Sequence, residues 1–358
     1  MKINNPRAIL SIIGMGVLTL AIIQSAVSGI SERQAEKKAA EELAAQPTAA
    51  PVRTVTISAV GDCTLATDEY AGQMKSFVET AEENDSSYFF KNVKKYFTDD
   101  DLTIVNFEGT LSNGGRREDK TFAFRGDPSY VDILTCSGIE AANLANNHSR
   151  DYGEVSNSDT HKILSDAGLA AFDSLNTVIY EVNGLKIGLI GINQLNDIDR
   201  TRLEAAMADA RAQNPDIIIA CIHWGEEKAT EPNEEQVAYG HKAIDLGADL
   251  VLGTHPHVLQ GIEQYNGGVI AYSLGNFCFG GNDSPSDMDT VIYRQKFTLE
   301  NGAKRSEISL VPCTISSSWE SGINNYQPTP AQGEKREAII EKMNGYNTAL
   351  GNVSVSYQ

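Results

Sequence analysis

From Val52 onward, short apolar runs alternate with stretches of helical character. The apolar runs are rich in β-branched residues, as expected of buried strands, and lie at 54–60, 102–107, 139–144, 186–192, 216–223 and 249–252. The helix-prone stretches lie at 129–136, 157–167, 199–213 and 234–246. This alternation predicts an α/β domain with largely parallel sheet segments. Asn183-Gly184 predicts a two-residue hairpin turn, so the sheet should be mixed, and further strands and a helix at 330–350 should follow Thr290.

The N-terminus carries a different pattern. Residues 8–27 are uncharged and almost wholly apolar, which is the length that a helix needs to span a bilayer. Lys2 and Arg7 precede this run and no acidic residue falls within 1–30, so the N-terminus should be cytoplasmic. We therefore expect a single-pass protein of the cell membrane whose C-terminal domain is extracellular. Small residues at 25–28 leave a cleaved signal peptide as the alternative.

The expected domains follow from these patterns. Residues 1–30 form the cytoplasmic tip and transmembrane anchor, and 31–51 form a charged, helix-prone linker that ends in proline-containing sequence. The α/β domain should occupy 52–320, followed by a C-terminal helix and tail at 321–358.

Composition restricts the partners. The 358 residues include 29 Lys and Arg against 48 Asp and Glu, a formal net charge of −19. This acidity argues against a nucleic-acid partner, because phosphate-backbone affinity comes from basic side chains. An anionic ligand would need a local positive centre, which a bound cation can supply. The five cysteines are widely spaced, so they do not form a disulfide scaffold.

Candidate chemistry gathers where the predicted strands end. Five strand-like runs lead directly into Gly61-Asp62, Asn106-Phe107-Glu108-Gly109, Asn146-Asn147-His148, His223-Trp224-Gly225 and Gly253-Thr254-His255-Pro256-His257. Ligands of open α/β sheets bind at the carboxyl ends of the strands. Carboxylate oxygen combined with imidazole nitrogen suits Zn, Mn or Fe, and one or two such divalent cations could activate water for hydrolysis.

Each of these segments also has a simpler interpretation. A Gly-Asp pair after a strand is usually a turn, and Asn-Asn-His alone is more often a loop or a helix cap. His148 in particular could cap the helix-prone stretch that begins near Asn157. The site prediction rests on all five segments occurring in order, each directly after a strand-like run.

The same segments resemble a known family. GD at 61–62, NFEG at 106–109, ANNHSRDYG at 145–153, HWGEE at 223–227, GADLVLGTHPHVLQG at 247–261 and YSLGNF at 272–277 are similar to the capsule-synthesis CapA family. That family is associated with poly-γ-glutamate capsules and resembles the calcineurin-like metallophosphatases. The resemblance covers about 55–279 and implies a four-layer α/β/β/α sandwich with metals at the strand ends, behind an N-terminal transmembrane helix.

The resemblance also implies individual roles. Asp62 and His257 would ligate a first metal, and Glu108 would stand where the superfamily has a bridging aspartate. A second metal would be ligated by Asn147, His223 and His255. His148 would donate a proton to the leaving group. Asn106, Asp151 and Glu227 would orient the side chains at the site by hydrogen bonding.

Two departures from the superfamily pattern leave alternatives open. Its Asp-x-His motif reads Asp62-Cys63-Thr64 here, and Glu108 is one methylene longer than aspartate. A single metal, or a site kept for structure, is therefore also compatible with the sequence. The domain could be a metallohydrolase acting on an extracellular anionic polymer, poly-γ-glutamate. It could instead be a non-catalytic accessory of membrane synthase or export subunits, or a secreted metallophosphoesterase.

Overall fold

The computed structural model describes residues 24, 27–38, 52–72 and 76–358. The chain divides into two compact units, Met1–Pro51 and Val52–Gln358. In the first unit, residues 27–38 are helical. Among the described residues, no helix combines the length and the apolar character needed to cross a bilayer. The predicted span at 8–27 lies outside the described residues except for positions 24 and 27, as does the linker beyond residue 38.

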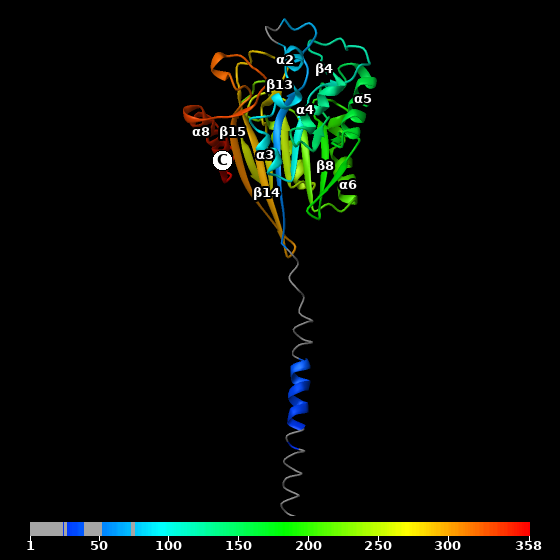
Figure 1. Cartoon of the computed structure of the whole chain (residues 1–358), viewed down its shortest axis with the longest axis vertical. Helices are drawn as coiled ribbons and strands as arrows, with labels where there is room; N and C mark the ends of the chain where they lie inside the picture. The colour runs from blue at the N-terminus through cyan, green and yellow to red at the C-terminus, as the bar shows by residue number, and fades with distance from the viewer. Residues whose placement is uncertain (1–23, 25–26, 39–51, 73–75) are drawn as a thin grey trace, which may run out of the picture. The chain divides into compact units, whose positions relative to one another are not determined.

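The second unit is built on two large sheets (Figure 1). The first sheet has nine strands, in the order β16-β15-β14-β1-β2-β5-β6, with β13 beside β1 and β17 beside β15. Its strands are β1 (Arg53–Thr64), β2 (Leu102–Phe107), β5 (Ala141–Asn143), β6 (Ala170–Phe172), β13 (Asn276–Phe279), β14 (Asp289–Glu300), β15 (Ala303–Thr314), β16 (Thr329–Pro330) and β17 (Val355–Tyr357). Strands β1, β2, β5 and β6 are parallel neighbours, whereas β14 runs antiparallel to β1.

The second sheet has six strands in the order β11-β12-β10-β9-β8-β7. They are β7 (Val178–Val182), β8 (Leu185–Asn193), β9 (Ile217–His223), β10 (Leu250–Thr254), β11 (Ile262–Tyr265) and β12 (Gly268–Ala271). Strands β8, β9, β10 and β12 are parallel, and a short separate pair joins β3 (Thr110–Leu111) to β4 (Arg125–Gly126). The prediction of a mixed α/β fold is therefore confirmed.

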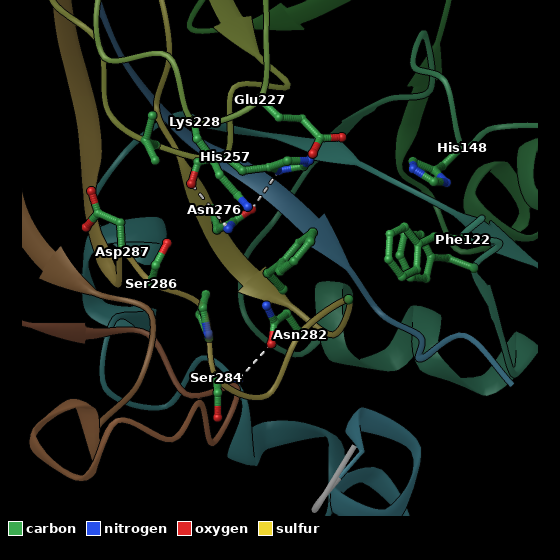
Figure 2. Close-up of a pocket in the computed structure, with 15 residues that line it drawn as sticks. Phe122, His148, Glu227, Lys228, His257, Asn276, Asn282, Ser284, Ser286 and Asp287 are labelled. Atoms are coloured by element: carbon green, nitrogen blue, oxygen red, sulfur yellow. Dashed lines mark hydrogen bonds between the residues drawn. The ribbon is translucent and has the colours of Figure 1, made fainter. Parts of the chain in front are cut away.

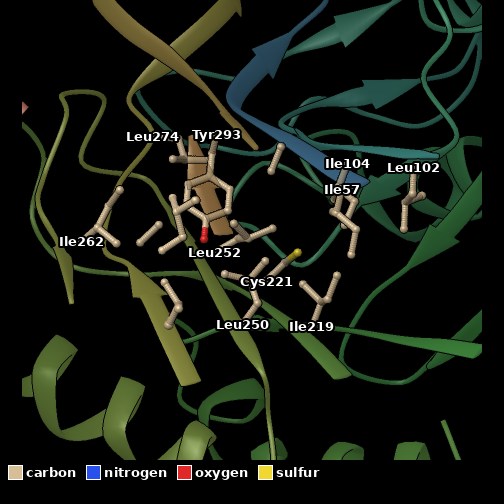
Figure 3. Packing of buried hydrophobic residues seen from close by; sticks show 14 of the residues in the cluster. Ile57, Leu102, Ile104, Ile219, Cys221, Leu250, Leu252, Ile262, Leu274 and Tyr293 are labelled. Carbon is tan, nitrogen blue, oxygen red and sulfur yellow. The ribbon is translucent and has the colours of Figure 1, made fainter. Parts of the chain in front are cut away.

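Three apolar clusters separate four layers. The cluster between the sheets joins Ile57 and Ile104 of the first sheet to Ile219 and Leu252 of the second (Figure 3). Alternate residues of the same strands face outward against helices, because successive side chains of a strand point to opposite faces. The outer face of the nine-stranded sheet packs on α2 (Phe77–Glu83), α3 (Lys94–Thr98), α4 (Val131–Thr135) and α5 (Gly153–Asp166). The outer face of the six-stranded sheet packs on α6 (Leu203–Ala212) and α7 (Glu234–Asp245).

The C-terminal helix α8 (Gly333–Ala349) belongs to the same compact unit as the sheets. Its Ile339 and Met343 are buried in the cluster between the sheets, and β17 pairs with β15. Burying one such side chain is worth roughly 1.5–3 kcal/mol. The domain limits expected at 320 and 321 stay a prediction.

The predicted elements appear with shifted ends. All six apolar runs are strands, and the hairpin turn of β7 and β8 has positive φ at Asn183 (52°) and Gly184 (69°), as a type I′ turn requires. Helix α5 starts at Gly153 rather than near Asn157, because its first turn is polar and hides the helical period. The stretches 129–136 and 199–213 each divide into a 3₁₀ turn followed by an α-helix.

Candidate metal centre

Both sheets deliver side chains to one site. Asp62 lies near the end of β1, Glu108 follows β2, and the segment with Asn147 and His148 follows β5, all from the nine-stranded sheet. His223 ends β9 of the six-stranded sheet, and His255 and His257 follow β10. The structure brings these strand ends together, with contacts between residues of the two sheets such as His223 with Asn147 and His257 with Asp62.

The backbone at the site is held in unusual conformations. His255 has φ 97° and His257 has φ 59°, in the left-handed region that costs a non-glycine residue energy. At Gly61 a Cβ atom would lie 1.8 Å from the carbonyl oxygen of Gly275, so only glycine fits before Asp62. The Asp62 backbone amide donates to the same carbonyl at 2.9 Å. These features hold Asp62 and the two histidines in place before any ligand arrives.

Glu108 belongs to two groups of potential metal ligands. One group is Asp62, Glu108 and His257, and the other is Glu108, His223 and His255, with ligand atoms within 4.8 Å of one another in each. Glu108 Oε1 lies 3.7 Å from His223 Nε2 and 4.0 Å from His257 Nε2. These separations are too long for hydrogen bonds, and they suit donors arranged around a cation. The two groups contain the carboxylates and histidines that the resemblance assigns to the two metals, whereas Asn147, also assigned to the second metal, belongs to neither group.

Two buried polar atoms at the centre support a cation. Glu108 is fully buried, and its Oε1 has no hydrogen-bond partner among the described residues. The same holds for Nδ1 of the buried His255. Leaving such groups unsatisfied costs about 1–3 kcal/mol each, and more when the group is charged. A divalent cation would satisfy both atoms, so the residues present fit Zn, Mn or Fe by their mixed oxygen and nitrogen donors.

The electrostatics of the site favour a cation as well. Burial, together with the Asp62 carboxylate, raises the pKa of Glu108 to about 8. Burial lowers the pKa of His257, but the Glu108 and Asp62 carboxylates outweigh it and bring the value to about 10. Burial and the charge of His257 lower the pKa of His255 to about 4. The crowded carboxylates therefore retain a proton at the site, whose place a metal cation can take.

Amide and hydroxyl groups orient the ligands. Asn106 Nδ2 donates to Asp62 Oδ1 at 2.7 Å, as expected for its supporting role. The sequence analysis did not identify Thr254, whose Oγ1 lies 3.0 Å from His223 Nδ1. It also did not identify Asn276, whose Oδ1 lies 2.9 Å from His257 Nδ1. Both lie inside the quoted motifs, at 247–261 and 272–277, which is the signal that could have identified them.

His148 has the surroundings of an oriented imidazole. Its Nδ1 lies 2.7 Å from Asp151 Oδ2, so Nε2 faces the site, 3.8 Å from Glu108 Oε1. Burial lowers the pKa of His148, and the Asp151 carboxylate opposes part of that shift. Helix α5 begins after Tyr152, which makes no side-chain capping bond. The alternative that His148 caps this helix is therefore wrong.

Lys120 also contacts this segment. Its ammonium donates to Asp151 Oδ1 at 2.7 Å and to the backbone oxygen of Asn147 at 2.8 Å. No motif pointed to Lys120, because it lies in a polar loop between β3 and β4. Asn147 in turn places Oδ1 2.9 Å from His223 Nε2, which brings together two of the ligands expected for the second metal.

The remaining candidates lie at the edge of the site or outside it. Glu227 is exposed, and no hydrogen bond joins it to a histidine in the part of the chain that the structure describes. Thr64 stands where the superfamily has histidine, and its hydroxyl lies 3.5 Å from Glu108 Oε2. His161 and His241 pair with Asp173 and Glu263 on other elements.

A pocket of about 390 Å³ opens beside His257 and His148 (Figure 2). Its wall combines aromatic and polar groups, including Phe122, Phe124, Lys228, Asn276 and Asp287. The pocket gives a substrate access to the edge of the ligand cluster. An arrangement of carboxylates, imidazoles and an oriented histidine next to a pocket is suited to metal-assisted hydrolysis.

Comparison with known proteins identifies relatives with capsule functions. The chain is 30% identical over 298 residues to the PGA biosynthesis protein CapA of Bacillus subtilis, covering 75% of each chain. It is 29% identical over 222 residues to the capsule biosynthesis protein CapA of Bacillus anthracis, where the match covers 54% of each chain. A probable polyglutamine synthesis accessory protein of Mycobacterium tuberculosis is 27% identical, over 59% of this chain and 64% of the relative. The chain thus spans about half the length of the Bacillus anthracis relative.

The family match covers most of the folded unit. Residues 56–281 match the family model described as bacterial capsule synthesis protein PGA_cap. The matched stretch begins within β1 and ends just after β13, so it includes every residue of the two ligand groups. The chain therefore belongs to the bacterial capsule synthesis protein family PGA_cap.

Proposed function

We propose that this protein acts in the biosynthesis of a poly-γ-glutamate capsule as a metal-dependent hydrolase. Its substrate would be the extracellular anionic polymer or the linkage that attaches it. Membership of the family and the Bacillus relatives support the capsule role. The single observation that supports hydrolysis is Glu108, which two ligand groups share and whose buried Oε1 has no hydrogen-bond partner among the described residues.

The residues divide the work as follows. One or two divalent cations would be held by two sets of ligands that share Glu108. The first set is Asp62, Glu108 and His257, and the second is Glu108, Asn147, His223 and His255. Bound there, the cations would supply positive charge that polarises the scissile bond and lowers the pKa of water. Asp151 holds Nδ1 of His148, so that Nε2 faces the pocket and can donate a proton to the leaving group.

Two features favour a second candidate, a non-catalytic accessory of membrane synthase or export subunits. Thr64 removes one imidazole from the superfamily pattern. The mycobacterial relative is also named an accessory protein. In this candidate the same cluster would bind the acidic polymer without cleaving it. A secreted metallophosphoesterase is the third candidate, and it differs from the first in substrate and in lacking the anchor.

We also propose that the protein is anchored by residues 8–27 with the folded unit outside the cell. The uncharged run and the preceding Lys2 and Arg7 support this topology. A domain held outside the membrane would meet a polymer as it is exported.

The deciding experiment combines metal analysis with turnover. The full-length protein, purified in detergent, is assayed for bound Zn, Mn and Fe and for hydrolysis of p-nitrophenyl phosphate esters and of poly-γ-glutamate. We expect bound metal and metal-dependent cleavage that His257→Ala abolishes and His241→Ala does not. Bound metal with polymer binding but no cleavage of any substrate would establish the accessory candidate. Cleavage of the phosphate esters without the polymer would favour the phosphoesterase.

A further inference from the structure

The two sides of the pocket differ in chemistry. Figure 2 shows His148 and Phe122 on one side, across from Asn276, Ser286 and Asp287 on the other. The named residues of the first side carry aromatic rings, and those of the second side carry polar groups. A substrate that spans the pocket therefore meets an apolar surface at one end and hydrogen-bonding groups at the other.

The aromatic side, which we call the Phe122 wall, consists of Phe122 and Phe124. The two rings are parallel within 4°, with centroids 6.5 Å apart. Phe124 is buried and its ring centroid lies 4.6 Å from that of His148. Phe122, in contrast, is 51% exposed. About half of the Phe122 side chain is thus accessible from the pocket, so a ligand that covers it would gain the free energy of burying that apolar surface.

Hydrogen bonds hold this wall rigidly. The Ala123 amide donates to Asp68 Oδ2 at 2.6 Å, and Arg117 pairs with the same oxygen at 2.7 Å. The Phe124 amide donates to Asp151 Oδ2 at 2.6 Å, and this oxygen also contacts His148 Nδ1. The wall and the imidazole therefore share one anchor, Asp151, and keep a fixed distance from each other.

The position of His148 indicates which part of a substrate would contact the Phe122 wall. A proton donor must lie next to the leaving group, because the proton is transferred to the atom that departs. The surface that adjoins His148 is then the leaving-group surface, while the polar side faces the part that is retained. This step rests on the function proposed above.

We propose that the Phe122 wall binds the leaving group of the substrate and that this group carries a ring with an apolar face, either aryl or sugar, so that the bond cleaved is the linkage of the polymer rather than an amide within it. A ring lies flat on an exposed phenylalanine and covers more of it than a single methyl group can. Stacking of this kind contributes a preference of about two- to tenfold over a leaving group without a ring. The retained part of the substrate would face Asn276 and Ser286 on the polar side.

Phosphonates test the wall without turnover, because their carbon–phosphorus bond is not hydrolysed. Binding of phenylphosphonate and of methylphosphonate to the full-length, metal-loaded protein is measured by calorimetry. We expect the wild type to prefer phenylphosphonate by about two- to tenfold, Phe122→Ala to lose the preference, and Phe122→Tyr to keep it. Leu175→Ala, which removes an apolar side chain that is 66% exposed and lies outside the pocket lining, should leave the preference unchanged.

Sugar phosphates then distinguish the two kinds of ring. A hexose 1-phosphate that competes better than glycerol 1-phosphate in the wild type, but not in Phe122→Ala, identifies a sugar ring. A phenyl preference without a hexose preference identifies an aryl ring. Equal affinities in the wild type, no binding of either phosphonate, or a preference that survives Phe122→Ala would overturn the inference. Ring preference without cleavage of any ester or of the polymer and its linkage would overturn the hydrolase proposal and the leaving-group assignment, because both need cleavage.

Discussion

Asp62 Oδ2 lies 3.0 Å from His257 Nδ1, although the two residues belong to different sheets. Asp62 is part of β1 in the nine-stranded sheet, and His257 follows β10 in the six-stranded sheet. The candidate metal centre therefore lies at the junction of the two sheets. The distances between the candidate ligands therefore depend on how the two sheets pack, as well as on which residues are present.

Removing a histidine of the cluster should remove metal. His255→Ala and His257→Ala each delete an imidazole from one of the two ligand groups. The loss in affinity should be at least the roughly 10–100-fold that losing an outer-shell partner costs. Elemental analysis of the purified variants checks this, with His161→Ala and His241→Ala as controls. Equal metal content in all four variants would show that the cluster does not bind metal.

His148→Ala should separate turnover from metal binding. His148 is absent from both ligand groups, so the variant should keep its metal. Loss of a proton donor typically lowers the rate by about 10²–10⁴-fold. Turnover and capsule polymer yield in cells are measured together. A metal-replete His148→Ala protein with full activity would refute hydrolysis through this residue.

Lys120→Met should impair the reaction by releasing Asp151 and His148. The substitution removes the ammonium that lies 2.7 Å from Asp151 Oδ1 and 3.3 Å from His148 Nδ1. Because the Lys120 charge lowers the pKa of His148, its loss should raise that pKa. The imidazole of His148 then stays protonated to higher pH. The basic limb of the profile of rate against pH should therefore shift to higher pH.

The control for this prediction is Lys120→Arg, which keeps the positive charge and should restore most of the rate. Profiles of rate against pH for the two variants and the wild type provide the measurement. An unchanged profile in Lys120→Met would mean that Lys120 serves only to hold its loop.

Ile219→Ala should destabilise the folded unit. Ile219 is fully buried between the sheets, and truncating such a residue costs about 2–5 kcal/mol in the free energy of unfolding. Ile198→Ala makes the same chemical change at a side chain that is 65% exposed, and should cost no more than about 0.5 kcal/mol. Urea unfolding measures both. Similar midpoints for the two variants would contradict the packing described here.

Protease added to intact cells should remove the folded unit and leave a short membrane stub. The apolar run 8–27 and the basic residues before it motivate this expectation. Immunoblotting with an antibody against the folded unit provides the measurement. Mature protein free in the medium, with a new N-terminus near residue 28, would instead establish a cleaved signal peptide.

The sequence by itself determined the strands and the chemistry at their ends. An apolar run such as 102–107 followed by Glu108 is a local pattern, and local patterns can be read without knowing the fold. Five such strand ends in order were sufficient to predict a site at the ends of the strands, and the family resemblance assigned the candidate ligands. The hairpin at Asn183-Gly184 could be predicted for the same reason, because the turn depends on only two residues.

Only the tertiary structure decided which groups surround these ligands. Lys120 contacts Asp151, which lies 31 residues further along the chain, and Asn276 contacts His257, which lies 19 residues before it. No periodicity marks a lysine in a polar loop or a phenylalanine at a pocket edge. The roles of such residues depend on groups that other parts of the chain bring to the site. The sharing of Glu108 between two ligand groups likewise exists only once two separate sheets have packed face to face.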